Sequence, residues 1–165
     1  MKEEEIKLKW KSYSSHLTQF LQDLMMNQSF TDVTLVCDDG QEIKSHKFVL
    51  CTSSFVLKNM ISSLPQTQNC GRLLWKGIKN QEMMSIIELM YLGKTEVNQE
   101  RKEFFITAIK SLKIHEFSKV QAIDSVINDK QQQSPCKYEM KWENYSEHLL
   151  RMLQEMFKAV DFTNV

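Results

Sequence analysis

The sequence is poor in the residues that break regular structure: its 165 residues include only two prolines and four glycines. This scarcity argues against a largely disordered chain. Hydrophobic residues make up 42% of the sequence and charged residues 25%, which is typical of a globular domain with an apolar core. A chain of this length holds one ordinary domain together with a short additional segment.

The sequence also lacks an excess of charge of one sign, because 21 basic residues balance 21 acidic ones. Without a broad cationic field, we expect no direct binding to nucleic acid and none to an anionic membrane. No stretch approaches the ~18 apolar residues of a membrane span, and the acidic residues 3–5 are unlike a secretory signal. These absences favour an intracellular protein.

Motifs of catalysis and metal binding are missing as well. The cysteines Cys37, Cys51, Cys70 and Cys136 form no Cys-x-x-Cys pair, and a reducing compartment keeps such residues as thiols. No Gly-x-Ser-x-Gly string or phosphate-binding loop occurs. His46, at an expected helix start, suits a structural hydrogen bond better than catalysis. The sequence therefore predicts no catalytic residue, no metal site and no cofactor, and the chain is not expected to be an enzyme.

A repeat is the clearest internal feature of the sequence. Residues 9–17, Lys-Trp-Lys-Ser-Tyr-Ser-Ser-His-Leu, recur as residues 141–149, Lys-Trp-Glu-Asn-Tyr-Ser-Glu-His-Leu, at an offset of 132. The alignment continues without a gap to 30–33 and 162–165, and 11 of its 26 positions from residue 8 onward are identical. Sequences of ordinary composition agree by chance at roughly one position in fifteen. The repeat therefore indicates a duplication.

The spacing of apolar residues predicts a helix in both copies of the repeat. Apolar residues occur at i, i+4, i+7, i+8, i+11 and i+12 from Tyr13, and at the same offsets from Tyr145. Before each helix, in 6–10 and in 138–142, apolar and charged residues alternate, which favours a short half-buried strand. Each copy is thus expected to form a strand followed by an amphipathic helix.

Between the two copies, the pattern predicts an α+β domain. The expected elements are strands at 33–37, 41–44 and 72–75, an extended segment at 95–97, and helices at 46–51, 55–61, 81–92, 99–112 and 114–123. Ser45 and Asn80 are suited to cap helices, Gly93 is suited to end one, and the turn at 38–40 is that of a hairpin.

The composition of 128–135 is that of a linker, because it is polar and ends in Ser-Pro. The expected organisation is a domain at 1–127, a linker at 128–137 and, at 138–165, a truncated second copy that contains only a strand and the first helix.

The order of the elements and several strings resemble the BTB/POZ family. Residues 30–35 and 43–50 are similar to its first core strand and the helix that follows, 89–93 to its Tyr-x-Gly helix end, and 108–114 to its Ala-x-x-Leu-x-Ile segment. Residues 8–10, Leu-Lys-Trp, are similar to the leader of the insect tramtrack-group subfamily, although Lys-Ser-Tyr replaces the asparagine-rich stretch that follows there. The resemblance covers roughly residues 6–118.

The resemblance implies a helical cluster that flanks a small sheet, and a dimer with a swapped N-terminal strand. The strand at 6–10 of one chain would pair with 95–97 of its partner, and the first helices would pack across the two-fold axis. The predicted dimer-interface residues are Leu8, Trp10, Leu17, Phe20, Leu21, Leu24 and Val97.

The partners implied by the resemblance are the chain itself, related BTB domains and co-regulators of transcription, in the nucleus. An alternative is a cytoplasmic substrate adaptor that recruits a cullin ubiquitin ligase.

Asp32 and Lys47 stand at positions that form a charged pocket at the dimer groove of relatives. A simpler alternative is a pair that only holds strand to helix. In the second copy, Asn164 stands where the first has Asp32, so that copy lacks the carboxylate.

Two explanations of the C-terminal segment remain open. Residues 138–158 could occupy, within the same chain, the place that a partner's residues 6–26 would take. Alternatively, the chain is a truncated product of a protein with tandem domains.

Overall fold

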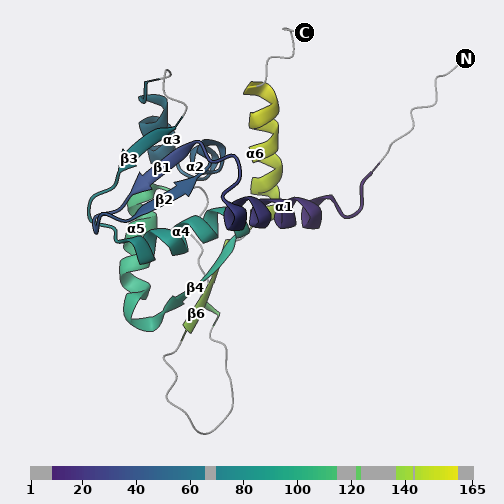
Figure 1. Ribbon diagram of the computed structural model, residues 1–165. Coiled ribbons are helices and arrows are strands. Elements are labelled where there is room, and N and C mark those ends of the chain that lie inside the picture. The colour runs from purple at the N-terminus through teal and green to yellow at the C-terminus, as the bar shows by residue number, and fades with distance from the viewer. Residues whose placement is uncertain (1–8, 66–69, 115–121, 124–136, 143, 160–165) are drawn as a thin grey trace, which may run out of the picture.

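The protein is an α+β domain in which helices surround a small three-stranded sheet, and a second small sheet extends from it (Figure 1). The computed structural model describes residues 9–65, 70–114, 122–123, 137–142 and 144–159. This arrangement agrees with the predicted fold class, a helical cluster that flanks a small sheet.

The first sheet contains β1 (Val33–Val36), β2 (Glu42–Ser45) and β3 (Gly71–Leu74) in the order β2-β1-β3. The β1 strand pairs antiparallel with β2 and parallel with β3. Strand β1 is the central strand. Its apolar residues Val33 and Leu35 are fully buried, which suits a position between two other strands. The predicted hairpin turn is confirmed: Gly40 has a φ of 75° and donates its N–H to the carbonyl oxygen of Cys37 over 3.0 Å.

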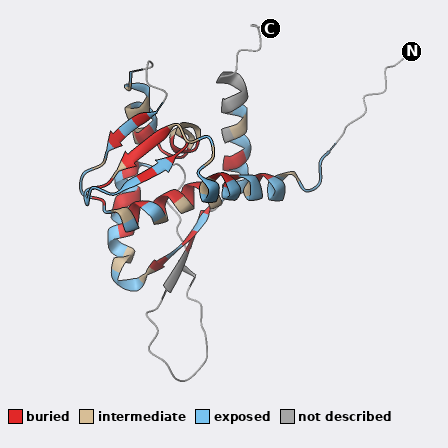
Figure 2. Cartoon of the chain, in the orientation of Figure 1, coloured by how far each residue is buried: buried red, intermediate tan, exposed pale blue. Residues whose placement is uncertain are grey.

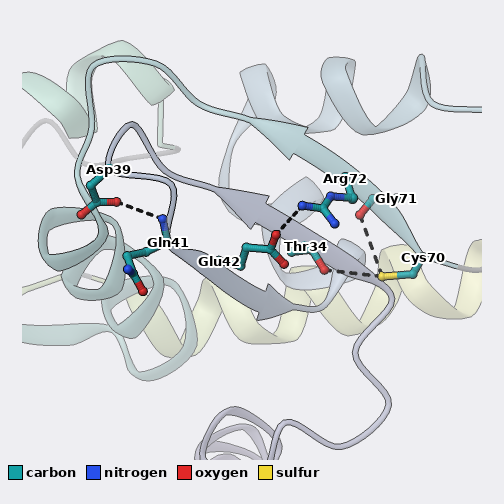
Figure 3. Close-up of polar contacts among 7 residues, drawn as sticks. All are labelled: Thr34, Asp39, Gln41, Glu42, Cys70, Gly71 and Arg72. Atoms are coloured by element: carbon teal, nitrogen blue, oxygen red, sulfur yellow. Dashed lines mark hydrogen bonds and ion pairs between the residues drawn. The ribbon is translucent and has the colours of Figure 1, made fainter.

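Polar contacts on this sheet are drawn in Figure 3. Arg72 on β3 and Glu42 on β2 form an ion pair that spans the central strand β1. Both side chains are largely exposed, so the pair contributes at most about 1 kcal/mol to stability. The hydroxyl of Thr34 lies 3.6 Å from the sulfur of Cys70, and the carboxylate of Asp39 accepts the backbone N–H of Gln41 in the hairpin turn.

The helices enclose one continuous core (Figure 2). They are α1 (Tyr13–Asn27), α2 (Lys47–Ser53), α3 (Phe55–Ser62), α4 (Asn80–Leu92), the short 3-10 helix η1 (Gln99–Arg101) and α5 (Lys102–Leu112). The central helix is α4, whose Met83, Ile86, Met90 and Tyr91 are almost completely buried. Helix α4 packs against α1, α2 and α5, and for this reason its apolar residues lie on more than one of its faces.

The second sheet contains β4 (Lys94–Asn98), β6 (Lys137–Lys141) and β5 (Ala122–Ile123) in the order β4-β6-β5. The last helix, α6 (Tyr145–Ala159), follows β6 directly. The predicted strand and helix of the C-terminal repeat are therefore confirmed by β6 and α6. Figure 1 shows β4 and β6 side by side, with α6 extending upward from the end of the ribbon where Gly93 lies.

Some expectations at the ends of elements were wrong. The expected helix at 114–123 is contradicted at both ends, because Ile114 forms an isolated bridge with Ser54, and Ala122 and Ile123 pair with β6. The partner strand β6 explains the difference, since it offers a free edge that a short segment can pair with.

Two expected features lie wholly or partly outside the described residues. Of the predicted N-terminal strand at 6–10, only Lys9 and Trp10 are described, and neither is in a strand. The predicted linker at 128–137 lies outside the described residues except for Lys137, which begins β6.

Two predicted helix caps were assigned to the wrong residues. The N-cap of α2 is His46, and Ser45 instead ends β2, where its hydroxyl lies 3.0 Å from that of Tyr91. Asn80 is the first residue of α4 and not its cap. Its backbone N–H donates to the carboxylate of Asp39 over 3.1 Å. The capping oxygen of α4 thus comes from the hairpin turn and not from the adjacent sequence.

Candidate association surface at strand β4

The edge of β4 receives the strand β6 of the same chain. The antiparallel register pairs Thr95 with Met140 and Val97 with Tyr138. Thr95, Val97 and Met140 are buried, whereas Lys94 and Glu96 on the opposite face of β4 are exposed. One face of this ribbon thus belongs to the core and the other meets solvent, as alternation along the strand requires.

Gly93 connects helix α4 to strand β4 and is the residue on which the ring of Tyr145 packs. It ends α4 in the left-handed conformation, with a φ of 70°, and its carbonyl oxygen accepts the N–H of Trp142 over 2.6 Å. The ring of Tyr145 lies directly on Gly93, where a Cβ atom would overlap with it. The hydroxyl of Tyr145 donates to the carbonyl oxygens of Met90, at 3.2 Å, and Tyr91. Glycine is required here both for the positive φ and for the close approach.

We call this surface the β4 acceptor site. It is defined by Gly93, Thr95, Val97 and the carbonyl groups of Met90 and Tyr91 at the end of α4. Burial raises the pKa of the Tyr145 phenol, and the neighbouring Tyr91 raises it further, so Tyr145 stays neutral and can donate its proton.

Three rings of the C-terminal segment form a cluster on the acceptor site. The ring centroids of Trp142 and His148 are 4.2 Å apart, and those of Trp142 and Tyr145 are 5.7 Å apart. Trp142, His148 and Leu149 are at most 4% exposed. Helix α6 also packs against α2. Its described buried residues lie in its first turns (Figure 2). Burial of this many large side chains indicates a substantial contact.

The same three residue types form a second cluster at the start of α1. The ring of Trp10 lies 5.4 Å from that of Tyr13 and 5.1 Å from that of His16. Trp10 is 57% exposed, however, against 4% for Trp142. The motif is thus present twice in one chain, once buried at the acceptor site and once largely exposed to solvent.

The predicted interface residues are distributed over several environments. Leu17, Leu21 and Leu24 are buried in the chain's own core, on the face of α1 that packs against α4. Phe20 is 50% exposed on the same helix. Leu8 lies outside the described residues.

Val97 is buried and pairs with β6 of its own chain, although the sequence assigned it to a partner's strand. The role of all seven residues at an interface between chains stays a prediction.

Asp32 and Lys47 lie in contact, but the carboxylate of Asp32 contacts the backbone of Lys47 and not its side chain. The carboxylate of Asp32 accepts the backbone N–H of Lys47 over 2.7 Å, at the first residue of α2. Within the described part of the chain, the Asp32 carboxylate forms no ion pair with the Lys47 ammonium group. Asp32 therefore caps α2 from the segment before β1, a contact that holds strand to helix. A role for the two residues in a charged pocket stays a prediction.

His46 is held in a buried hydrogen-bond network with Tyr91. Its Nε2 lies 2.6 Å from the carbonyl oxygen of Ser29, which can only accept, so Nε2 carries the proton. Its Nδ1 then accepts from the Tyr91 hydroxyl over 2.6 Å. The same hydroxyl accepts the backbone N–H of His46 over 3.0 Å, and the Ser45 hydroxyl lies within 3.0 Å of it. This arrangement fits the predicted structural role of His46, and burial raises the pKa of Tyr91.

Sequence reasoning did not name Gly93, Trp142 or Tyr145 as site residues. The signal was present, because Trp142 and Tyr145 are identical to Trp10 and Tyr13 at the offset of 132. Gly93 was assigned only to the end of a helix. Its second role, the approach of an aromatic ring, depends on a contact with a residue 52 positions away that only the fold reveals.

The described residues offer few other candidate sites. Cys37, Cys51 and Cys70 are free thiols, and the described part of the chain has no cluster of residues that could hold a metal ion. None of the described helices is both long and apolar enough to cross a bilayer.

Curated relatives match about two thirds of the chain. The tramtrack protein, alpha isoform, of Drosophila melanogaster is 32% identical over 113 residues, which cover 68% of this chain and 14% of tramtrack. The longitudinals lacking protein-like of the same fly is 32% identical over 107 residues, which cover 65% of this chain and 82% of that protein. Tramtrack and the Broad-complex core protein are thus far longer than the region matched, since the chain spans 14% and 16% of their lengths.

Solved structures with the same fold include two BTB domains. That of human gigaxonin has a TM-score of 0.55 and 21% identity and covers 66% of this chain and 87% of its own. That of zebrafish PATZ1 has a TM-score of 0.57 and 16% identity and covers 94% of this chain and 100% of its own. At these identities the likeness supports the fold alone.

The model of the family described as "BTB/POZ domain" matches residues 21–125. The match does not extend over 138–165, so the comparison gives no support for a second family copy there, and that assignment stays a proposal. The matched region, which includes α1 from Leu21 onward, both β1 and β4, and α4, covers well over half of the sequence. The chain therefore belongs to the BTB/POZ domain family of protein–protein interaction modules.

Proposed function

We propose that this domain is a self-association module that joins two copies of the chain, or this chain and a related BTB domain, by exchange of N-terminal strands. The observation that carries the proposal is the exposed aromatic cluster of Trp10, Tyr13 and His16, whose counterpart at 142–148 is buried on the β4 acceptor site. Large aromatic side chains dominate the energetics of interfaces. The N-terminal cluster therefore has the residues that an acceptor site of this kind binds.

Helix α1 adds further support for an interface. It exposes Phe20 at 50% and Met26 at 71%, and the exposed Trp10 lies just before its first residue. Single exposed apolar residues are common on monomers, but several large ones on one element favour an association surface. Strand β4 also favours pairing between chains, because the backbone edge that pairs with β6 can pair in the same way with a strand from another chain.

We place this module in a regulator of transcription in the nucleus, where it would recruit co-regulators, as the resemblance to the tramtrack group implies. The module has no enzymatic role in this proposal. The alternative, a substrate adaptor of a cullin ubiquitin ligase, predicts that a cullin copurifies with the tagged chain from cells. Retention of a cullin together with a cytoplasmic location would favour the adaptor over the transcriptional role.

The self-association proposal is tested by sedimentation equilibrium of the full chain over a wide concentration range. We expect Trp10→Ala to raise the dissociation constant by about 30-fold, which corresponds to about 2 kcal/mol. Phe20→Ala is expected to weaken association less. The matched control is Phe55→Ala, because Phe55 is 52% exposed but lies on α3, away from the proposed interface. Equal dissociation constants for the three variants and the native chain would exclude α1 and its leader from the interface.

A further inference from the structure

The chain carries two copies of the segment that fits the β4 acceptor site but only one such site among its described residues. The site is occupied by β6 and the start of α6, so the described residues offer the exposed N-terminal cluster no such site within its own chain. A second copy of the chain presents the same situation. Association through β4 therefore requires that the resident segment leave.

We propose that residues 137–149 are a displaceable intramolecular occupant of the β4 acceptor site, and that the N-terminal segment, residues 5–16, of a second copy binds there when they leave. This inference rests on the proposed self-association and adds its regulation. A tethered segment acts at an effective concentration in the millimolar range, so it occupies the site in a dilute chain. Its release makes the site available to a second copy.

The resident segment is an imperfect occupant, because the described residues provide no hydrogen-bond partner for the buried indole Nε1–H of Trp142. A buried donor of this kind weakens the contact. The N-terminal cluster brings its own acceptor, since the Nε1–H of Trp10 donates to the hydroxyl of Ser12 over 3.0 Å. At the offset of 132, Asn144 replaces this serine and has a φ of 60°.

The charges of the two segments also favour the N-terminal segment as the occupant of the site. The β4–β6 register places Glu139 opposite Glu96, two acidic residues at directly paired positions. Like charges at such positions destabilise a strand pair, and opposite charges stabilise it. The N-terminal segment has Lys7 at the position that corresponds to Glu139. A second copy bound in the same register would therefore pair Lys7 with Glu96.

The apolar positions of the two segments are equivalent. Leu8 corresponds to the buried Met140, and Trp10 and Tyr13 are identical to their counterparts at 142 and 145. Leu17, the counterpart of Leu149, is buried against α4 of its own chain and takes no part in the exchange. The N-terminal segment thus keeps the aromatic residues that contact the site, and it adds an acceptor for the indole and a lysine at the position opposite Glu96. Displacement by a second copy follows from this difference.

The repeat supplies a matched pair of variants that tests the proposal in the full chain. Trp10→Ala removes the anchor of the incoming segment, and Trp142→Ala removes the same anchor from the resident one. We expect Trp142→Ala to lower the dissociation constant for self-association at least tenfold, because a larger fraction of sites is free. Trp10→Ala is expected to raise the constant at least tenfold, and the double variant is expected to associate as weakly as Trp10→Ala.

A charge variant is expected to stabilise the resident segment on the acceptor site and so to weaken self-association. Glu139→Lys places a lysine opposite Glu96 in the resident strand and is expected to weaken self-association about threefold. The matched control is Lys137→Glu, whose position lies opposite the uncharged Asn98 and is expected to leave the dissociation constant unchanged. If Trp142→Ala unfolds the chain, Tyr145→Ala and the charge variants carry the test, with circular dichroism as the check on folding.

A labelled peptide of residues 1–27 separates the two possible failures. The inference predicts that it binds Trp142→Ala at least tenfold more tightly than the native chain, by fluorescence anisotropy. If folded Trp142→Ala and the native chain self-associate equally and bind the peptide equally, the resident segment does not control the site, although self-association stands. If neither chain self-associates nor binds the peptide, the proposed function itself is wrong.

Discussion

The ring of Tyr145 rests on the Cα atom of Gly93, 52 positions earlier in the chain, and leaves no room for a side chain there. Gly93 also has a positive φ, which costs an L-residue roughly 1–2 kcal/mol. We therefore expect Gly93→Ala to lower the free energy of unfolding by about 3 kcal/mol, more than backbone strain alone explains. Denaturation with urea measures this loss.

Tyr145→Ala tests the origin of that loss. If the clash contributes, the double variant Gly93→Ala, Tyr145→Ala is more stable, by about 1 kcal/mol or more, than the sum of the two single losses predicts. Gly77→Ala is the control, because Gly77 has a φ of 85° and open space around its Cα atom. Additive losses at 93 and 145 would show that the ring is not held on Gly93.

Asp32 and Lys47 are expected to respond very differently to substitution. Asp32→Ala removes the oxygen that accepts the Lys47 N–H, so the free energy of unfolding should fall by about 1 kcal/mol, the usual contribution of a helix cap. Lys47→Met keeps the backbone donor and should change stability by less than about 0.5 kcal/mol. The measurement is chemical denaturation of both variants. A larger loss for Lys47→Met than for Asp32→Ala would restore the ammonium group as the partner.

Much of the fold could be predicted from the sequence because local pattern determines it. The hairpin, β3, α3, α4 and the strand and helix of the C-terminal repeat follow from apolar periodicity and turn residues. The caps of α2 and α4 could not be found this way, since their oxygens belong to Asp32 and Asp39, 15 and 41 positions away. These carboxylates reach the helices only after β1 and its hairpin have packed.

The acceptor site was only half predictable. Repetition of Trp10 and Tyr13 at 142 and 145 indicated that one segment could replace the other, but sequence could not decide which copy occupies β4. Strand β5 was assigned to a helix, because two residues are too few for a periodicity to appear. It exists through its pairing with β6, which is a tertiary contact.

Tyr91→Phe is expected to be strongly destabilising although it removes a single oxygen atom. That oxygen contacts the backbone N–H and Nδ1 of His46 and the hydroxyl of Ser45, and both residues are at most 3% exposed. Loss of buried hydrogen-bond partners costs about 1–3 kcal/mol each, so we expect the unfolding free energy to fall by about 3 kcal/mol. Tyr13→Phe, on a partly exposed ring, serves as the control. Similar losses in both variants would mean that the network around His46 contributes little.

The three described cysteines should react with iodoacetamide in an order set by burial. Burial raises the pKa of Cys37, with Asp39 and Glu82 adding to the effect, and burial also raises that of Cys51 despite the nearby Lys58. A raised thiol pKa means a smaller thiolate fraction at pH 7.5, and only the thiolate is the nucleophile. Cys70 is exposed and should be alkylated first.

Mass spectrometry of a Cys136→Ser chain, sampled over time, follows this reaction. Labelling of Cys37 and Cys51 should accelerate as the pH rises towards their raised pKa values, and mild urea should accelerate it at constant pH by opening the core. The folded chain keeps Cys37 almost entirely covered, so its labelling rate should follow the population of unfolded molecules. Alkylation of Cys37 as fast as Cys70 in the native chain would contradict the packing of β1 described above.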